Sequence, residues 1–267
     1  MKRHAVVAGQ FYAGAASKLK EQVEHYIEKE AAREKVLAVV SPHAGLMYSG
    51  PVAGAVYSSI RFPETFVILG PNHTGRGANL SVMTSGSWEV PTGTFFVDGD
   101  LGKRVVKEVP LMAEDASAHL SEHSIEVQLP FISYFSDAVK IVPIAVLSAS
   151  LEECRAIGEG IAKAIKETGR DVVIVASSDM SHYVPDDTAR KLDTLAINEM
   201  LNLNPEGLYT TVAEHRITMC GVIPATIMLY AAKALGAGEA KLVKYATSGE
   251  TSGDYGHVVG YAGILVK

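Results

Sequence analysis

The fold is indicated most clearly by the stretch Val36-Leu-Ala-Val-Val40-Ser-Pro-His43-Ala-Gly45, in which a short apolar run leads directly into a histidine-bearing Gly/Pro turn. Two more apolar runs, 66–69 and 172–176, lead in the same way to His73 and His182. Short apolar runs between turn residues are typical of buried parallel strands. Open α/β sheets bind ligands at the carboxyl ends of their strands. We therefore expect the three histidines to converge at one edge of one sheet.

Helical and strand patterns alternate along the whole chain. The helices are expected at 17–33, 51–60, 100–109, 123–135, 152–168, 187–201 and 223–235. Further strands are expected at 140–146, 241–247 and 258–266, with an antiparallel excursion formed by 80–84 and 94–97. This alternation predicts an α/β fold, a single-domain αβα sandwich with a mostly parallel central sheet over residues 1–267.

Composition excludes several classes of function. The chain has 267 residues, of which 48% are hydrophobic, and a formal net charge of −6 without a long basic run, so nucleic-acid binding is not expected. No apolar stretch reaches the roughly 20 residues of a membrane span, and the N-terminus lacks a secretory apolar core. Two cysteines, Cys154 and Cys220, are expected to be free in a reducing compartment. We expect a cytoplasmic protein that does not bind membranes.

His43 and His73 occupy equivalent positions after consecutive strands. Neutral imidazole is the commonest protein ligand for transition metals, so the pair favours a metal or acid–base centre. The alternative is structural, with each ring capping a helix or bonding a carbonyl group. Gly75 and Gly77 follow His73, but the dinucleotide fingerprint GxGxxG and a Walker lysine are missing, which disfavours nucleotide chemistry.

The segment Ser177-Ser-Asp179-Met-Ser-His182 places a carboxylate three residues before an imidazole. In a turn, this spacing lets Asp179 orient the His182 ring, as carboxylates do for catalytic histidines. The alternative is that Asp179 or Ser181 caps a helical turn.

The segment Glu122-His123-Ser-Ile-Glu126-Val-Gln128 combines two acids, an imidazole and an amide at an expected helix start. His123 and Glu126 would share one helix face, and His119 could join them. A catalytic acid or substrate clamp is one interpretation, and an amphipathic surface helix is the other.

Cys220 lies just before the apolar helix expected at 223–235. Helix N-terminal amides favour a thiolate, which suits a soft metal ligand or a nucleophile. A buried inert cysteine is the ordinary alternative. Cys154 is interpreted as structural, and the sequence does not place His257 at either edge of the sheet.

These segments resemble the Memo family, whose prokaryotic members are also called AmmeMemoRadiSam system protein B. The resemblance covers nearly the whole chain and is carried by six motifs in order: Ala8-Gly-Gln-Phe-Tyr12, Ser41-Pro-His43-Ala-Gly45, Leu69-Gly-Pro-Asn-His73, Glu122-His123-Ser-Ile-Glu126-Val-Gln-Leu-Pro130, Ser177-Ser-Asp179-Met-Ser-His182 and Met219-Cys220-Gly221. The family is similar in fold to class III extradiol (LigB-type) dioxygenases, which are non-haem iron(II) enzymes.

The resemblance implies His43, His73 and Cys220 as metal ligands, His182 as an acid–base residue and His123 in the pocket. Asp179 would orient His182. The resemblance to the dioxygenases implies Fe(II), and because Cys220 replaces a carboxylate with a soft ligand, copper is implied as well, with zinc as an alternative. The expected activity is metal-dependent oxidoreductase chemistry on a small-molecule or peptide substrate.

Two other functions remain open. The chain could be a non-catalytic module that binds a peptide or partner, since the family name suggests AMMECR-type and radical-SAM proteins as partners in a modification system. Cys220 could instead act as a nucleophile activated by a histidine.

Overall fold

Four buried strands form the parallel centre of the main sheet. The computed structural model describes residues 1–267, and these strands lie side by side in the order β2 (Ala38–Ser41), β9 (Val172–Ser177), β3 (Thr65–Pro71) and β8 (Lys140–Val146). All their residues except Lys140 are buried, as expected for strands covered on both faces.

Antiparallel strands extend the sheet on both sides. Strand β12 (Val258–Val266) pairs with β2 and also carries β10 (His182–Val184) and β11 (Ala240–Thr247). At the other edge, β4 (Leu80–Val82) pairs antiparallel with β8 and parallel with β7 (Ala113–Glu114). A separate three-stranded sheet contains β1 (Lys2–Arg3), β5 (Ser87–Val90) and β6 (Gly93–Phe96).

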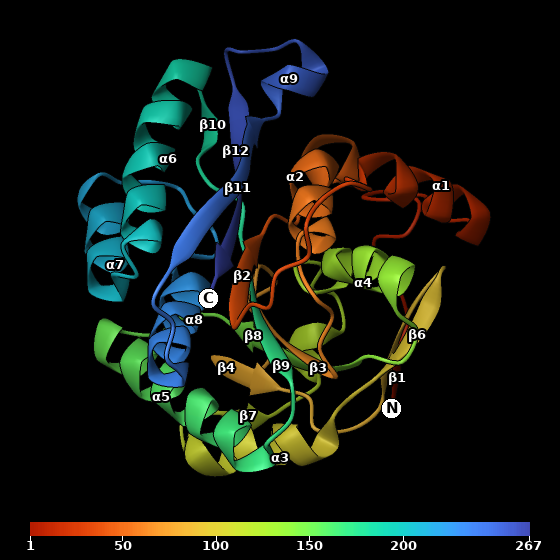
Figure 1. The fold of residues 1–267 in the computed structure, drawn as a ribbon, viewed down its shortest axis with the longest axis vertical. Helices are drawn as coiled ribbons and strands as arrows, with labels where there is room; N and C mark the ends of the chain where they lie inside the picture. Colours follow the sequence, from red (N-terminus) through yellow and green to blue (C-terminus); the bar gives the residue numbers. More distant parts are fainter.

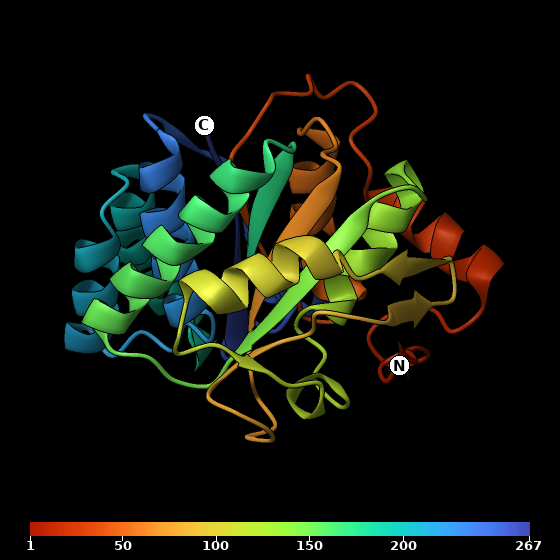
Figure 2. The same ribbon diagram turned by 90° about the horizontal axis from the view of Figure 1, so that it is seen from below.

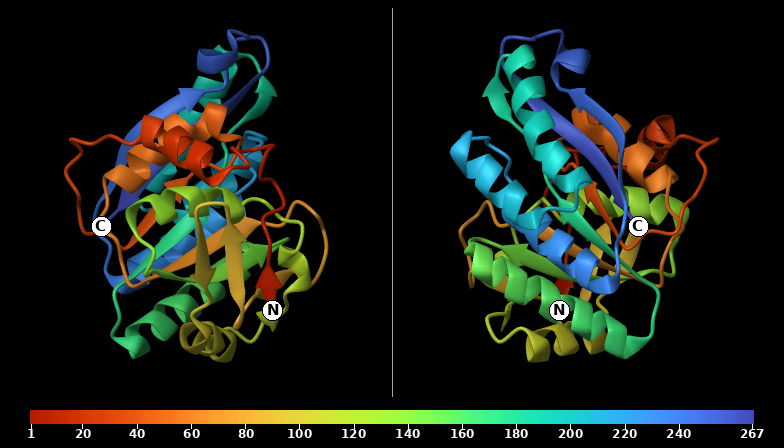
Figure 3. Two further views of the ribbon diagram at one scale, coloured as in Figure 1. Left: turned by 90° about the vertical axis from the view of Figure 1, so that its right-hand side faces the viewer. Right: turned by 60° about the vertical axis from the view of Figure 1, so that its left-hand side comes forward.

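Helices cover both faces of the main sheet (Figures 1, 2 and 3). One face packs against α3 (Gly99–Glu108), α5 (Leu151–Thr168), α6 (Asp186–Leu201), α7 (Pro205–Glu214) and α8 (Val222–Leu235). The other face packs against α1 (Ala16–Tyr26), α2 (Leu46–Ser58), α4 (Leu129–Phe135) and the small sheet. Along β3, Val67 and Leu69 pack in the hydrophobic core on the first of these faces, whereas Phe66 and Ile68 pack in the core on the second face. The predicted αβα sandwich with its parallel centre is confirmed.

Several predicted elements are confirmed within a residue or two. Strand 140–146 matches β8, and helix 152–168 matches α5, which begins with a Ser150 capping box and ends at Gly169 with φ +64°. The helix expected at 223–235 matches α8, whose C-cap Gly236 has φ +102°. None of the helices combines the length and the apolar character needed to cross a bilayer. Both cysteines are free, as predicted.

Other boundaries were predicted wrongly. The first helix ends at Tyr26 instead of residue 33, because Ile27 is extended and the Glu28 amide donates to Ser58 Oγ. Helix α2 begins at Leu46 instead of residue 51. The expected helix 123–135 is regular only as α4, preceded by the 3-10 turns η1 (Ser117–His119) and η2 (Glu126–Gln128).

The expected antiparallel pair 80–84 and 94–97 does not form. Strand β4 pairs with β8, and β6 pairs with β5 in the small sheet. The elements β1, β5, β7, β10, α7 and the short helix α9 (Gly249–Ser252) have no counterpart among the predicted ones.

His119 is a buried part of this fold and not of a helix face shared with His123. Its ring is fully buried, packs edge-on against Trp88 at 5.8 Å, and neither ring nitrogen makes a hydrogen bond of good geometry. Burial lowers the pKa of His119 from 6.5 to about 4. The folded protein therefore resists protonation of this imidazole.

We predict that His119 makes the protein less stable as the pH falls from 6.5 towards 4. In this range the unfolded chain binds a proton at residue 119 that the folded chain rejects, which costs the folded state up to about 3 kcal/mol. Urea unfolding at a series of pH values should show a shallower loss for His119→Phe than for the wild type. The variant His215→Ala, at an exposed position, is the control. A His119→Phe profile parallel to the wild-type profile contradicts the prediction.

Candidate metal centre

Three parallel strands are each followed, two residues after their last residue, by a polar side chain of the candidate site. His43 follows the last residue of β2 by two positions, His73 follows β3 by two, and Asp179 follows β9 by two. The rings of His43 and His73 meet at a centroid distance of 5.3 Å. The predicted convergence of these two histidines at the carboxyl edge of the sheet is confirmed.

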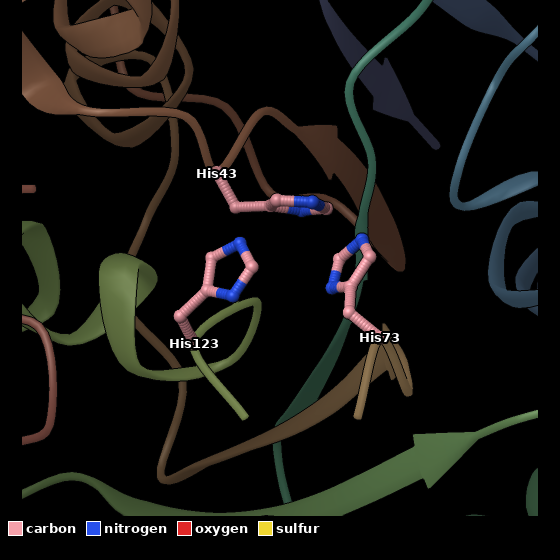
Figure 4. A group of neighbouring side chains, drawn as sticks. All are labelled: His43, His73 and His123. Atoms are coloured by element: carbon pink, nitrogen blue, oxygen red, sulfur yellow. The ribbon is translucent and has the colours of Figure 1, made fainter. Parts of the chain in front are cut away.

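The third imidazole of the cluster is His123. One nitrogen from each of His43, His73 and His123 lies within 4.8 Å of the others, and the three rings face one another (Figure 4). The His123 ring stacks on His73 at 4.7 Å and packs against Phe11 at 4.8 Å. His123 reaches this place from the turn before η2, and not from a helix face.

His182 is not a member of this cluster. It lies at the start of β10, where its backbone N–H donates to Thr218 Oγ1 at 2.7 Å and its Nδ1 lies 2.8 Å from the Thr218 carbonyl oxygen. The third histidine beside His43 and His73 is therefore His123, and not the His182 that the sequence pattern predicted. His257 is exposed and precedes Val258, which pairs with Val184, so it lies on the His182 side of the molecule.

The Asp179 carboxylate makes no hydrogen bond with the His182 ring, whose Nδ1 lies against the Thr218 carbonyl oxygen. The Asp179 carboxylate instead accepts hydrogen bonds from the backbone amides of His43 at 2.8 Å and Ala44 at 3.3 Å. Burial raises the pKa of Asp179. Asp179 thus connects the end of β9 to the loop of a neighbouring strand and holds the backbone of His43 in place.

Glu122 has a role that the sequence analysis did not assign. Its fully buried carboxylate accepts from His73 Nδ1 at 2.9 Å, from the His73 amide at 2.6 Å, and from the amides of His123 and Ser124, each at 2.9 Å. Burial alone would raise the pKa of Glu122, but these hydrogen bonds and the neighbouring imidazoles lower it to about 2. The sequence signal for this role was an acid directly before a histidine of the cluster. The helix predicted at 123–135 placed this acid at a helix start, so a buried role was not expected.

Cys220 lies beside His43, outside the group of three imidazoles. Its Sγ is 3.4 Å from His43 Nε2 and accepts from the Asp179 amide at 3.3 Å. Burial raises the pKa of the Cys220 thiol, so the expected thiolate-favouring effect of the α8 N-terminus is outweighed. A cysteine nucleophile needs the thiolate, and this environment disfavours it.

The three imidazoles of the cluster differ in their exposure to solvent. His43 is 2% exposed, whereas the side chains of His123 and His73 are 23% and 35% exposed. Burial lowers the pKa of both His43 and His123, which keeps these imidazoles neutral. Neutral imidazoles offer a nitrogen lone pair, so the donor set fits a transition metal that a small molecule can reach from the His73 side.

Comparison with known proteins agrees with the sequence motifs. The profile of the family described as Memo-like protein matches residues 3–265. A MEMO1 family protein of Methanothermobacter thermautotrophicus is 40% identical, over 98% of this chain and 99% of its own. Another, from Aquifex aeolicus, is 43% identical over 98% of each chain.

One solved structure supports the fold alone. The crystal structure of an uncharacterised protein from Escherichia coli K12 matches with a TM-score of 0.57 and 13% identity, over 86% of this chain and 100% of the other. The family profile and the relatives, by contrast, extend through all the segments that build the histidine cluster. This chain belongs to the Memo-like protein family.

Proposed function

We propose that this chain binds one transition-metal ion at the histidine cluster and uses it for redox chemistry. The observation that carries the proposal is the convergence of three imidazole nitrogens within 4.8 Å, with a buried carboxylate behind one of the rings. Iron(II) or copper bound there would supply electron transfer to or from a small substrate. The chain's own residues would provide the ligands, their orientation and a route for protons.

His73 is prepared as a ligand by Glu122. An ionised carboxylate only accepts hydrogen bonds, so the contact at 2.9 Å places the imidazole proton on Nδ1 of His73. Nε2 then keeps its lone pair for a metal. Carboxylate–histidine pairs of this kind fix the tautomer and raise the basicity of the ligand in metalloproteins.

The third ligand decides which metal is preferred. His123 is the third nitrogen of the cluster, and Cys220 lies against His43 at 3.4 Å. Imidazole ligands suit iron, copper and zinc alike, whereas a thiolate shifts preference towards copper(I) or zinc. We propose Fe(II) or copper as the native metal, with zinc as the alternative, and Cys220 as a further ligand once a metal replaces its proton.

His182 remains our proposed acid–base residue. Its Nδ1 faces the Thr218 carbonyl oxygen at 2.8 Å, and a carbonyl oxygen only accepts, so Nδ1 carries a proton. Nε2 is then the atom that can take up or release a proton. Asp179 acts on His43 through the backbone, as a positioning residue.

A second function, binding of a peptide or partner protein, is favoured by exposed apolar side chains in the segments that carry His43, His182 and His257. Met47, Tyr183 and Tyr255 are 54%, 74% and 51% exposed. Tyr183 follows His182 directly and has φ +58°, a strained conformation for a bulky residue, which is often found at functional sites. AMMECR-type and radical-SAM proteins in the cytoplasm are the partners we propose for this function, which needs no metal.

We predict that the wild type binds about one metal ion per chain, as one mononuclear site requires. Anaerobic titration with Fe(II), Cu(I) and Zn(II) should show that His73→Ala abolishes tight binding, with the exposed His215→Ala as control. His123→Ala and Cys220→Ser should each weaken binding as well, and the variant whose loss approaches that of His73→Ala identifies the third ligand. Equal metal binding by wild type and His73→Ala contradicts the proposal.

We also predict that Glu122→Gln lowers metal affinity by roughly 10–100-fold, the usual effect of removing a carboxylate behind a ligand histidine. The amide keeps the size of the side chain but cannot accept from all the donors that surround it. Competition with a chromogenic chelator gives the affinity. The control is Glu159→Gln, an exposed acid on α5, and an unchanged affinity in Glu122→Gln speaks against the role of Glu122.

A further inference from the structure

We infer that Ser177 is a positioning residue that keeps the proton of His43 on Nδ1. The Nε2 atom, which serves the cluster, is then unprotonated. The importance of Ser177 for ligand binding rests on the proposed metal function, but the tautomer itself is a property of the metal-free protein. Ser177 is the last residue of β9 and is fully buried.

The Ser177 hydroxyl has three partners. His43 Nδ1 lies 2.9 Å from Oγ, Gln128 Nε2 lies 2.8 Å from it, and the Ser124 carbonyl oxygen lies 2.7 Å from it. A serine hydroxyl can donate one hydrogen bond and accept two. Ser177 can therefore form all three hydrogen bonds only if one partner accepts its proton and the other two donate to its oxygen.

The roles of two partners follow from their chemistry. The Ser124 carbonyl oxygen cannot donate, so it receives the one Ser177 proton. The Gln128 amide is oriented by its other contacts: Nε2 faces the Pro42 carbonyl oxygen at 2.9 Å, and Oε1 accepts from Tyr57 O–H at 3.0 Å. Gln128 Nε2 consequently donates to Ser177.

His43 is then left with one role. Because the Ser177 proton is used on Ser124, His43 Nδ1 must donate its own proton to Ser177 Oγ. The opposite tautomer would take the Ser177 proton away from the buried Ser124 carbonyl group and would place N–H against Cys220 Sγ, a weak acceptor at 3.4 Å. The neutral network therefore selects Nε2 as the ligand atom of His43.

The two ligand histidines thus differ in how their tautomers are fixed. A carboxylate, Glu122, holds the Nδ1 proton of His73, whereas a neutral hydroxyl, Ser177, holds that of His43. A second serine offers a matched comparison. Ser41 is the cross-strand neighbour of Ser177, is equally buried, and its Oγ has no hydrogen-bond partner.

The test measures the tautomer of His43 in metal-free protein labelled with ¹⁵N-histidine. Two-bond ¹H–¹⁵N correlation spectra distinguish the tautomers, and the signals of His43 are those missing from His43→Gln. We expect Nδ1–H in the wild type and in Ser41→Ala. In Ser177→Ala, where Nδ1–H loses its acceptor, Nε2–H should become populated. Ser177→Thr, which retains a hydroxyl, should keep Nδ1–H.

Zinc affinity, measured by chelator competition on the same variants, should fall roughly 10–100-fold in Ser177→Ala and stay unchanged in Ser41→Ala. A wild-type protein with Nε2–H, or a Ser177→Ala variant with unchanged tautomer and affinity, overturns the inference. If the tautomer changes as expected but the wild type binds no metal, the proposed function fails while the role of Ser177 stands.

Discussion

The site depends on buried hydrogen bonds made by one short segment, Glu122–Gln128. Its three long polar side chains, Glu122, Glu126 and Gln128, are fully buried, although a polar group removed from water is stable only when hydrogen-bonded. Each reaches a different part of the chain. Glu122 binds the His73 loop, Gln128 binds the end of β2 and Ser177, and Glu126 binds the N-terminal segment. The histidines meet because these segments are held to one another.

The contacts of Glu126 extend this network beyond the histidine cluster. The carboxylate pairs with the buried Arg3, accepts from the amides of Val6 and Val7, and accepts from Tyr12 O–H at 2.5 Å. Arg3 in turn donates to the carbonyl oxygen of Glu122 at 2.6 Å and lies over the Trp88 ring. Breaking such a buried pair leaves an uncompensated charge, which typically costs about 3–5 kcal/mol. The small sheet and the N-terminus are therefore energetically linked to the loop that carries His123.

The sequence predicted the parts of this arrangement that depend on local pattern. Apolar runs ending at Pro-His43 and Asn-His73 indicated parallel strands, and the shared edge followed from the geometry of such sheets. The third histidine was a different matter. His182 has the same local signal as His43, but β10 pairs with β12 and the His182 ring lies against the Thr218 carbonyl oxygen, while His123 is positioned by Glu122. The pairing of β10 with β12 and the contact of His182 with Thr218 join residues far apart in the chain, so the periodicity of one segment cannot predict them.

The role of Glu122 also could not be predicted from local pattern. A buried carboxylate is costly unless paired, so an acid in an expected amphipathic helix is naturally assigned to the surface. Here the turn at 122–125 is irregular because its amides donate to Glu122 and not to a preceding helical turn. The same hydrogen bonds therefore interrupt the regular helix and stabilise the buried Glu122 carboxylate, which lies beside the imidazoles of His73 and His123. At this site, the segment that supplies Glu122 and His123 is the one whose local structure departs from the sequence pattern.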